Sequence, residues 1–205
     1  SSSGRLVRCR TGARRGAWLL ILAALLPLAC APSDHTSGSI DFQVTVGGGM
    51  ISCDFEVDTC AWTDTAPDGF SWTRRSGGTP SSSTGPSGDH TTGSGYYLFT
   101  EASARPNKLH QLESPLFSLQ QDATLSFFHH MRGWSMGTLS VDASDDANGW
   151  STLWSRTGSQ GNSWLDAAVV LPASATKVRF NSRTGNGWSS DMALDGVSFS
   201  QFTPP

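Results

Sequence analysis

Residues 85–98 read GPSGDHTTGSGYYL, a glycine-rich loop that runs directly into an apolar strand, and this stretch decides the expected fold. Glycine permits positive φ angles, while Asp89 and the neighbouring threonines can form hydrogen bonds with nearby amides, so the loop has specific backbone requirements. Such a loop can hold an ion or close the edge of a β-sandwich. Its residues alone favour neither role.

Short apolar runs separated by clusters of Gly, Ser, Thr and Pro continue on both sides of this loop. Several short strands with turn signals between them indicate an antiparallel sandwich or barrel. Alternate residues of a strand share one face, so the core is predicted to contain Leu125, Phe127, His129 and Met131, then Leu139, Val141 and Ala143, then Val178 and Phe180. Strands are expected at 42–46, 70–74, 96–101, 108–114, 124–131, 137–143, 151–155, 165–171, 177–181 and 191–200.

The composition agrees with a β-rich exported domain. The chain has 205 residues, which suits one domain of ordinary size, and its 37% hydrophobic and 15% charged residues are low for a globular protein because Ser, Gly and Thr are abundant. Beyond the N-terminus no stretch keeps a helical period free of Gly and Pro, which argues against a helical bundle.

The N-terminal segment has the pattern of a secretory signal peptide at 1–31. Five arginines precede an apolar run at 17–29, and small residues stand at Ala29 and Ala31. Rival interpretations are an uncleaved anchor, an organelle transit peptide and a bacterial lipoprotein signal ending at Cys30, which Pro27 disfavours. We expect a flexible linker at 32–50, a domain at 51–200 and a tail at 201–205. The protein would be secreted or held at the cell surface.

The charge and cysteine content limit the partners and the compartment. Nine basic and 17 acidic residues follow residue 31, and 9 − 17 gives −8, so nucleic acid is not an expected partner. Cys53 and Cys60 are expected to form a disulfide in an oxidising compartment, with two unpaired thiols as the alternative. Closing this short loop would stabilise the fold by about 2.5 kcal/mol.

Seven blocks in a fixed order resemble the MAM domain: CDFEVDTCAW at 53–62, FSWTRRSG at 70–77, the opening stretch, LESPLF at 112–117, LSFFHHMRGWSMGTLSV at 125–141, QGNSWLDAAVVL at 160–171 and DMALDGVSFS at 191–200. The resemblance implies a jelly-roll sandwich of the concanavalin A-like kind that serves as a non-catalytic extracellular adhesion module. Its partner would be another protein or a second copy, and the parent protein would supply any membrane attachment. The family usually has a second disulfide, whose cysteines would fall near Thr124 and just past Ser200, and this chain lacks both.

The same resemblance suggests a structural cation, most simply Ca²⁺. The matching positions are Glu56, Asp89 and Asp195, and Asp58 would be an additional ligand. Calcium takes six to eight oxygen ligands from carboxylates and backbone carbonyls, and acids beside glycine-rich backbone provide these. The alternative is that the four acids accept hydrogen bonds from nearby amides and cap turns.

Tryptophans give a rival function, because carbohydrate-binding sandwiches stack aromatic rings on sugars. Trp134, Trp150 and Trp188 are expected in loops and are the candidate contact residues. The family positions of the remaining tryptophans beyond the signal predict a core role for Trp62, Trp72, Trp154 and Trp164.

The sequence does not predict an enzyme. No glycosidase-like array of alternating carboxylates and no HExxH, GxSxG or P-loop motif is present. Asp142, Asp145 and Asp146 are interpreted as a solvated turn at a strand end. His129 and His130 are adjacent on a strand and therefore face opposite ways, which argues against a shared zinc ion.

Overall fold

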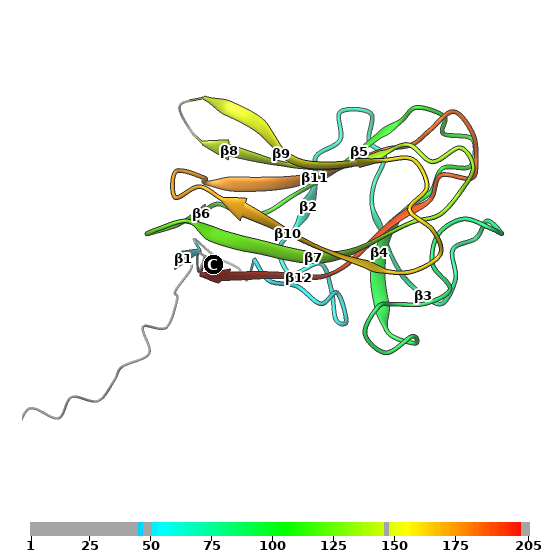
Figure 1. The fold of residues 1–205 in the computed structure, drawn as a ribbon, viewed down its shortest axis with the longest axis horizontal. Coiled ribbons are helices and arrows are strands. Elements are labelled where there is room, and N and C mark those ends of the chain that lie inside the picture. Colours follow the sequence, from blue (N-terminus) through cyan, green and yellow to red (C-terminus); the bar gives the residue numbers. More distant parts are fainter. Residues whose placement is uncertain (1–44, 47–50, 146–147, 202–205) are drawn as a thin grey trace, which may run out of the picture. The chain divides into compact units, whose positions relative to one another are not determined.

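Two five-stranded antiparallel sheets face each other in the computed structural model, which describes residues 45–46, 51–145 and 148–201 (Figure 1). The strands are β1 (Thr45–Val46), β2 (Thr63–Asp64), β3 (Thr73–Ser76), β4 (Tyr96–Thr100), β5 (Leu109–Glu113), β6 (Phe117–Ser118), β7 (Ala123–Met131), β8 (Thr138–Asp145), β9 (Gly149–Thr157), β10 (Leu165–Leu171), β11 (Lys177–Arg183) and β12 (Met192–Gln201). The predicted all-β jelly-roll sandwich, of the concanavalin A-like kind, is confirmed.

We name each sheet after its central strand. The β12 sheet has the order β10-β7-β12-β4-β3, and the β11 sheet has the order β2-β5-β11-β8-β9. Figure 1 shows β8, β9 and β11 in one layer and β7 and β12 in the other. A two-stranded pair of β1 and β6 completes the topology of the described residues.

The core lies between the two sheets and contains the residues that alternation predicted. Leu125, Phe127 and Val141 are buried, and the Phe127 ring meets that of Phe180 from the opposite sheet at a centroid distance of 4.9 Å. His129 also faces this core and lies against Trp154, whereas His130 faces the other side of the sheet. The opposite orientation of the two histidines is therefore confirmed.

Some predicted strand limits were wrong, mainly because hairpin pairing extends strands through polar residues. The β8–β9 ladder runs from Thr138↔Thr157 to Asp145↔Gly149, so both strands are longer than their apolar runs. Strand β3 begins at Thr73 and not at Phe70, and β2 and β6 were not predicted. Of the expected strand at 42–46, only 45–46 fall within the described residues. The proposed signal peptide at 1–31, most of the linker and residues 202–205 lie outside them.

The N-terminal edge of the domain is fixed by the predicted disulfide. The sulfur atoms of Cys53 and Cys60 are 2.07 Å apart, which confirms the bridge. Cys53 also exchanges two backbone hydrogen bonds with Val197 of β12, with N–O distances of 2.7 and 2.8 Å. The positions near the family's second bridge, Thr124 and Ser200, are paired residues of β7 and β12. Strand pairing alone joins the sheet there.

The outer faces of the two sheets differ. Tyr97, Phe99 and Ala193 form a second apolar cluster on the outer face of the β12 sheet, and the half-buried Trp164 packs on it. The glycine-rich loop within residues 85–98, called the opening loop below, contributes to this cover, because the Trp164 indole donates a hydrogen bond to the Gly88 carbonyl at 3.1 Å. On the outer face of the β11 sheet, polar side chains line a groove.

Candidate functional site

The opening loop is organised around the buried carboxylate of Asp89. This carboxylate accepts hydrogen bonds from the backbone amides of Thr91, Thr92 and Gly95 at 3.0, 2.8 and 2.6 Å. Burial alone would raise the pKa of Asp89, but these bonds to the charged form outweigh it and lower the pKa below the usual 3.8. Asp89 therefore orders the loop as an ionised group.

Two further acids meet the same loop from distant parts of the chain. Asp195 accepts the His90 amide at 2.8 Å, and Glu56 accepts the Tyr96 amide at 3.2 Å. Burial, followed by repulsion from Asp89 and Glu56, raises the pKa of Asp195 to about 6, although Asp195 accepts hydrogen bonds from the amides of His90 and Gly196. A Cβ atom at Gly95 would lie 2.1 Å from Glu56 Oε1, so a larger residue there would displace this carboxylate from its present position.

Three of the four predicted calcium ligands therefore converge, and one does not. The exposed Asp58 accepts the Cys60 amide at 2.7 Å within the disulfide loop, as a turn-capping acid would. Oxygen donors of the other three suit Ca²⁺ chemically. Their positions are less suitable for binding an ion than their chemistry is, since within the described ranges no group of three His, Cys, Asp or Glu side chains is placed to hold a metal ion. Calcium binding stays a prediction.

Two of the three candidate tryptophans form one exposed pair. Trp134 lies in the loop between β7 and β8, Trp188 in the loop between β11 and β12, and their rings meet edge to face at a centroid distance of 4.6 Å. The exposed fractions are 71% for Trp134 and 42% for Trp188, so a large aromatic surface faces solvent.

The two loops that carry this pair are held together tightly. The Ser190 hydroxyl accepts hydrogen bonds from the amides of Gly137 and Gly185 at 3.0 and 2.8 Å. A Cβ atom at Gly185 would lie 1.7 Å from the Ser135 carbonyl oxygen, so the close approach of the loops requires glycine. The Trp134–Trp188 pair is therefore presented by a defined backbone.

The third candidate, Trp150, is not in a loop as predicted, because the extended β8–β9 hairpin includes it in β9. It is half-buried, and the Arg179 guanidinium lies over its ring at 4.1 Å from the centroid. The predicted core tryptophans behave as expected: Trp62 and Trp72 are buried, and Trp154 and Trp164 pack against the two apolar clusters.

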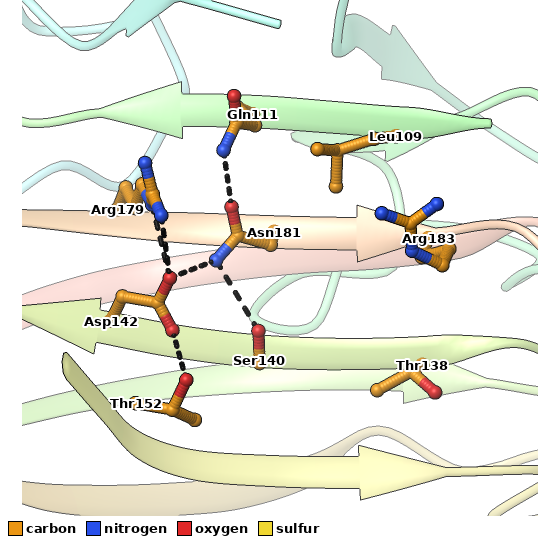
Figure 2. A pocket seen from close by; sticks show the side chains of 9 residues that line it. All are labelled: Leu109, Gln111, Thr138, Ser140, Asp142, Thr152, Arg179, Asn181 and Arg183. Carbon is orange, nitrogen blue, oxygen red and sulfur yellow. Dashed lines mark hydrogen bonds and ion pairs between the residues drawn. The ribbon is translucent and has the colours of Figure 1, made fainter. Parts of the chain in front are cut away.

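A polar groove of about 360 Å³ lies on the outer face of the β11 sheet (Figure 2). Strands β5, β8, β9 and β11 contribute its nine lining residues: Leu109, Gln111, Thr138, Ser140, Asp142, Thr152, Arg179, Asn181 and Arg183. Figure 2 shows Arg183 near Leu109 at one end and the Asp142–Arg179 pair toward the other.

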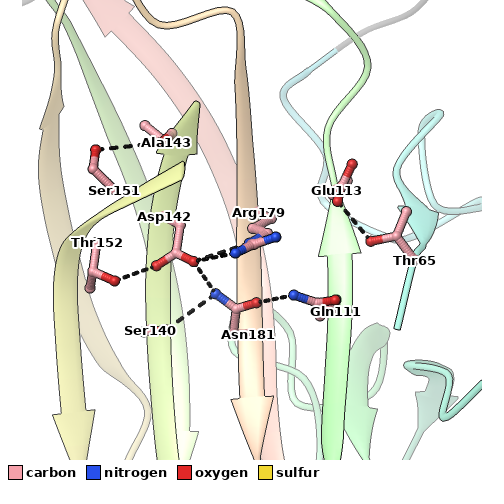
Figure 3. Close-up of polar contacts among 10 residues, drawn as sticks. All are labelled: Thr65, Gln111, Glu113, Ser140, Asp142, Ala143, Ser151, Thr152, Arg179 and Asn181. Atoms are coloured by element: carbon pink, nitrogen blue, oxygen red, sulfur yellow. Dashed lines mark hydrogen bonds and ion pairs between the residues drawn. The ribbon is translucent and has the colours of Figure 1, made fainter. Parts of the chain in front are cut away.

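A hydrogen-bond network forms the floor of this groove (Figure 3). Asp142 accepts bonds from Arg179 Nε and Nη2, both at 3.0 Å, and from Asn181 Nδ2 at 2.8 Å. Thr152 donates to its other oxygen at 2.7 Å, and Gln111 donates to Asn181 Oδ1 at 2.8 Å. Five polar side chains from four strands are thus linked.

The interpretation of Asp142 as part of a solvated turn was wrong. Asp142 lies within β8, is 7% exposed and is the register partner of Arg179 on β11. A signal for this was present in the sequence, because Thr138, Ser140 and Asp142 alternate with apolar residues, and Arg179 and Asn181 flank the apolar Phe180. Asp145 does lie at the strand end, where it accepts the Asn148 amide, and Asp146 lies outside the described residues.

The two packed antiparallel sheets define a jelly-roll sandwich that carries a polar groove and an exposed aromatic pair on its surface. The sequence matches the family described as MAM domain, meprin/A5/mu, over residues 53–203. The chain belongs to this family.

Several curated relatives agree with this assignment. Human MAM domain-containing protein 2 is 40% identical over 151 residues, which cover 72% of this chain and 22% of the relative. Rat MAM domain-containing glycosylphosphatidylinositol anchor protein 1 is 34% identical over 183 residues, covering 80% of this chain and 19% of the relative. The chain thus spans about a fifth of the length of these relatives.

Solved structures support the fold alone. The K1 cleaved adhesin domain of Lys-gingipain from Porphyromonas gingivalis W83 superposes with a TM-score of 0.57 at 19% identity, covering 77% of this chain and 100% of that chain. The K3 domain of the same protein gives a TM-score of 0.55 at 20% identity, covering 75% of this chain and 98% of that chain. As for membrane spans, the part of the chain that the structure describes contains no helix long and apolar enough to cross a bilayer.

Proposed function

We propose that this chain is a non-catalytic adhesion or protein-interaction module of a secreted or cell-surface protein. The observation that carries the proposal is the exposed Trp134–Trp188 pair, held on two interlocked loops. Tryptophan is enriched at the energetic centres of protein interfaces, and exposed aromatic surface on a defined backbone is typical of a docking site. Membership of the MAM family and the Cys53–Cys60 disulfide support an extracellular setting.

The non-catalytic part of the proposal is supported by the chemistry of the groove. Asp142 is the one acid among its lining residues, and its oxygens already accept bonds from Arg179, Asn181 and Thr152. Glycoside hydrolysis in most families needs two carboxyl groups across the scissile bond. The groove therefore suits binding better than hydrolysis.

Calcium at the opening loop is a further part of this proposal. Asp89 and Glu56 repel the charged form of Asp195 and so add, after burial, to the raised pKa of Asp195, and a divalent cation would relieve this repulsion. Its role would be to stabilise the loop. Calorimetric titration of the chain with CaCl₂, with MgCl₂ as the comparison salt, tests this role. An unchanged melting temperature and no heat of binding with CaCl₂ would exclude calcium binding.

Sedimentation velocity of the secreted chain tests the docking surface. If the partner is a second copy, the wild type will show concentration-dependent association that the double variant Trp134→Ala/Trp188→Ala loses. Arg156→Ala on β9 is the control, since its side chain is exposed and its guanidinium lies over Trp154 and not over either ring of this pair. Association that persists in the double variant would exclude the tryptophan pair as the self-docking surface.

Carbohydrate binding is a second candidate function, favoured by the polar groove with Trp150 beside Arg179 at its flank. The loop pair Trp134–Trp188 is the other place where a sugar ring could stack. Glycan-array binding that Trp188→Ala abolishes would favour the loop pair, and binding that this variant retains would favour the groove.

A further inference from the structure

We propose that the groove on the outer face of the β11 sheet binds an acidic oligosaccharide, with Arg183 as the residue that meets its anionic group. The inference rests on the carbohydrate-binding candidate and is independent of the protein-docking role of the Trp134–Trp188 pair. The two surfaces have no residue in common.

The lining of the groove selects a polar ligand. Leu109 is its one aliphatic residue, and the other eight have polar or charged side chains. The energetic centre of a protein–protein interface is usually apolar and built from buried aromatic anchors, whereas eight of these nine residues are polar or charged. A folded protein or an apolar peptide is therefore a poor match.

The floor of the groove is ordered before any ligand arrives. Gln111, Asp142 and Asn181 are each less than 9% exposed, and their side chains bond to one another or to neighbouring strands. Arg179 is held between the Asp142 carboxylate and the Trp150 ring. Because a ligand would not have to immobilise these side chains, the entropic cost of binding is reduced.

Hydrogen-bonding capacity remains above this floor, and both donors and acceptors contribute. Among the described residues, Gln111 Oε1 and Arg179 Nη1 take part in no hydrogen bond. Ser140 accepts a bond from Asn181 and Thr152 donates one to Asp142, so the Ser140 proton and the Thr152 lone pairs are unused. A sugar hydroxyl both donates and accepts hydrogen bonds. It therefore matches this mixture of donors and acceptors better than a group that can only donate or only accept.

Charge determines which class of sugar fits best. The groove carries Arg179, Arg183 and Asp142, which sum to +1, whereas the chain beyond residue 31 sums to −8. Within the described structure, the exposed Arg183 donates to the Asn107 carbonyl and has no carboxylate partner. A guanidinium binds a carboxylate or sulfate through two parallel bonds, so an anionic sugar gains most at this end of the groove.

Isothermal titration of the secreted chain with four hexameric probes tests the proposal. The probes are a hyaluronan hexasaccharide with carboxylates, a chondroitin sulfate hexasaccharide with carboxylates and sulfates, neutral chitohexaose, and hexaglutamate. At least one acidic hexasaccharide should bind about tenfold more tightly than chitohexaose and hexaglutamate, since one charge-assisted hydrogen bond typically changes affinity by about tenfold or more. Comparing the first two probes shows whether carboxylate or sulfate is the preferred anion.

Three variants then locate the site. Arg183→Glu should weaken binding of the acidic hexasaccharide by about tenfold or more, while Arg156→Glu, the same charge change at an exposed position outside the groove, should change it by less than about twofold. Trp134→Ala/Trp188→Ala should leave the affinity unchanged. Melting temperatures would verify that each variant is folded.

Several outcomes would overturn the proposal. These are no binding of either acidic hexasaccharide at about 1 mM, equal binding of hexaglutamate, or equal losses in Arg183→Glu and Arg156→Glu, which would indicate unspecific attraction. Loss of sugar binding in the tryptophan double variant would move the site to the loop pair and reject the groove. None of these results depends on whether the chain self-associates.

Discussion

The two outer faces of the sandwich lie on equivalent five-stranded sheets and yet differ in what lies above them. On the β12 sheet, the opening loop and Trp164 cover an apolar cluster of Tyr97, Phe99 and Ala193. On the β11 sheet, polar side chains of four strands form a groove with a hydrogen-bonded floor. One face is closed by its own chain, and the other is open to solvent.

This difference separates structural from recognition residues. Residues 85–98 close a face through the hydrogen bonds of Asp89 and the bond between Gly88 and Trp164, so this sequence is constrained by folding. Arg183 of the groove and the Trp134–Trp188 pair are exposed and can vary without unfolding the core. Substitutions on the covered face should therefore reduce stability, and substitutions on the exposed surfaces should reduce binding.

The largest expected effect is the removal of the aromatic cover. Trp164→Ala should destabilise the fold by about 4 kcal/mol, because Trp164 packs against Tyr97 and His130 and its indole bonds to Gly88. Trp134→Ala, the same change at an exposed ring, should alter the free energy of unfolding by less than about 1 kcal/mol. Urea denaturation measures both, and similar losses would refute the contrast.

The next effect is a pH dependence that originates on the covered face. Burial lowers the pKa of His130 from 6.5 to about 4. The charges of Arg132 and His129 lower it further, and hydrogen bonds that the His130 ring donates to Asn162 oppose this shift. The unfolded chain therefore binds more protons between about pH 6.5 and pH 4, and stability falls as pH falls through this window by about 3 kcal/mol at full titration.

Denaturation of His130→Gln at several pH values checks this contribution. Asp195 acts in the opposite sense, because its pKa of about 6 lies above the ordinary 3.8 and protonation favours the folded state as pH falls. The difference between wild type and variant isolates the histidine. An identical pH slope in the two proteins would show that His130 is not held neutral.

A smaller effect is expected within the opening loop. Asp89→Ala should cost about 2 kcal/mol, because it leaves the Thr91, Thr92 and Gly95 amides without their acceptor. Asp58→Ala removes a single bond at an exposed turn and should cost about 0.5 kcal/mol. Thermal unfolding compares the two, and equal costs would mean that Asp89 does not organise the loop.

The sequence predicted the core well and the site only partly. Alternation in 124–131 places Leu125 and Phe127 inward whatever the partner strand is, so local pattern is sufficient for the core. The groove depends on the register between β5, β8 and β11, which joins Gln111, Asp142 and Asn181, and no local pattern determines that register. The same applies to the contact of Trp134 with Trp188, which needs two distant loops to meet.

Adhesion of coated beads tests the central claim most directly. Beads carrying the secreted chain would be mixed with one another and with cells, in parallel with Trp134→Ala/Trp188→Ala beads and with beads carrying the control variant Arg156→Ala. The account predicts clustering or cell attachment by the wild type and the control, and loss of at least about 90% of it in the double variant, as expected when interface hot spots are removed. Wild-type beads that neither cluster nor attach, or double-variant beads that adhere as well as the wild type, would contradict it.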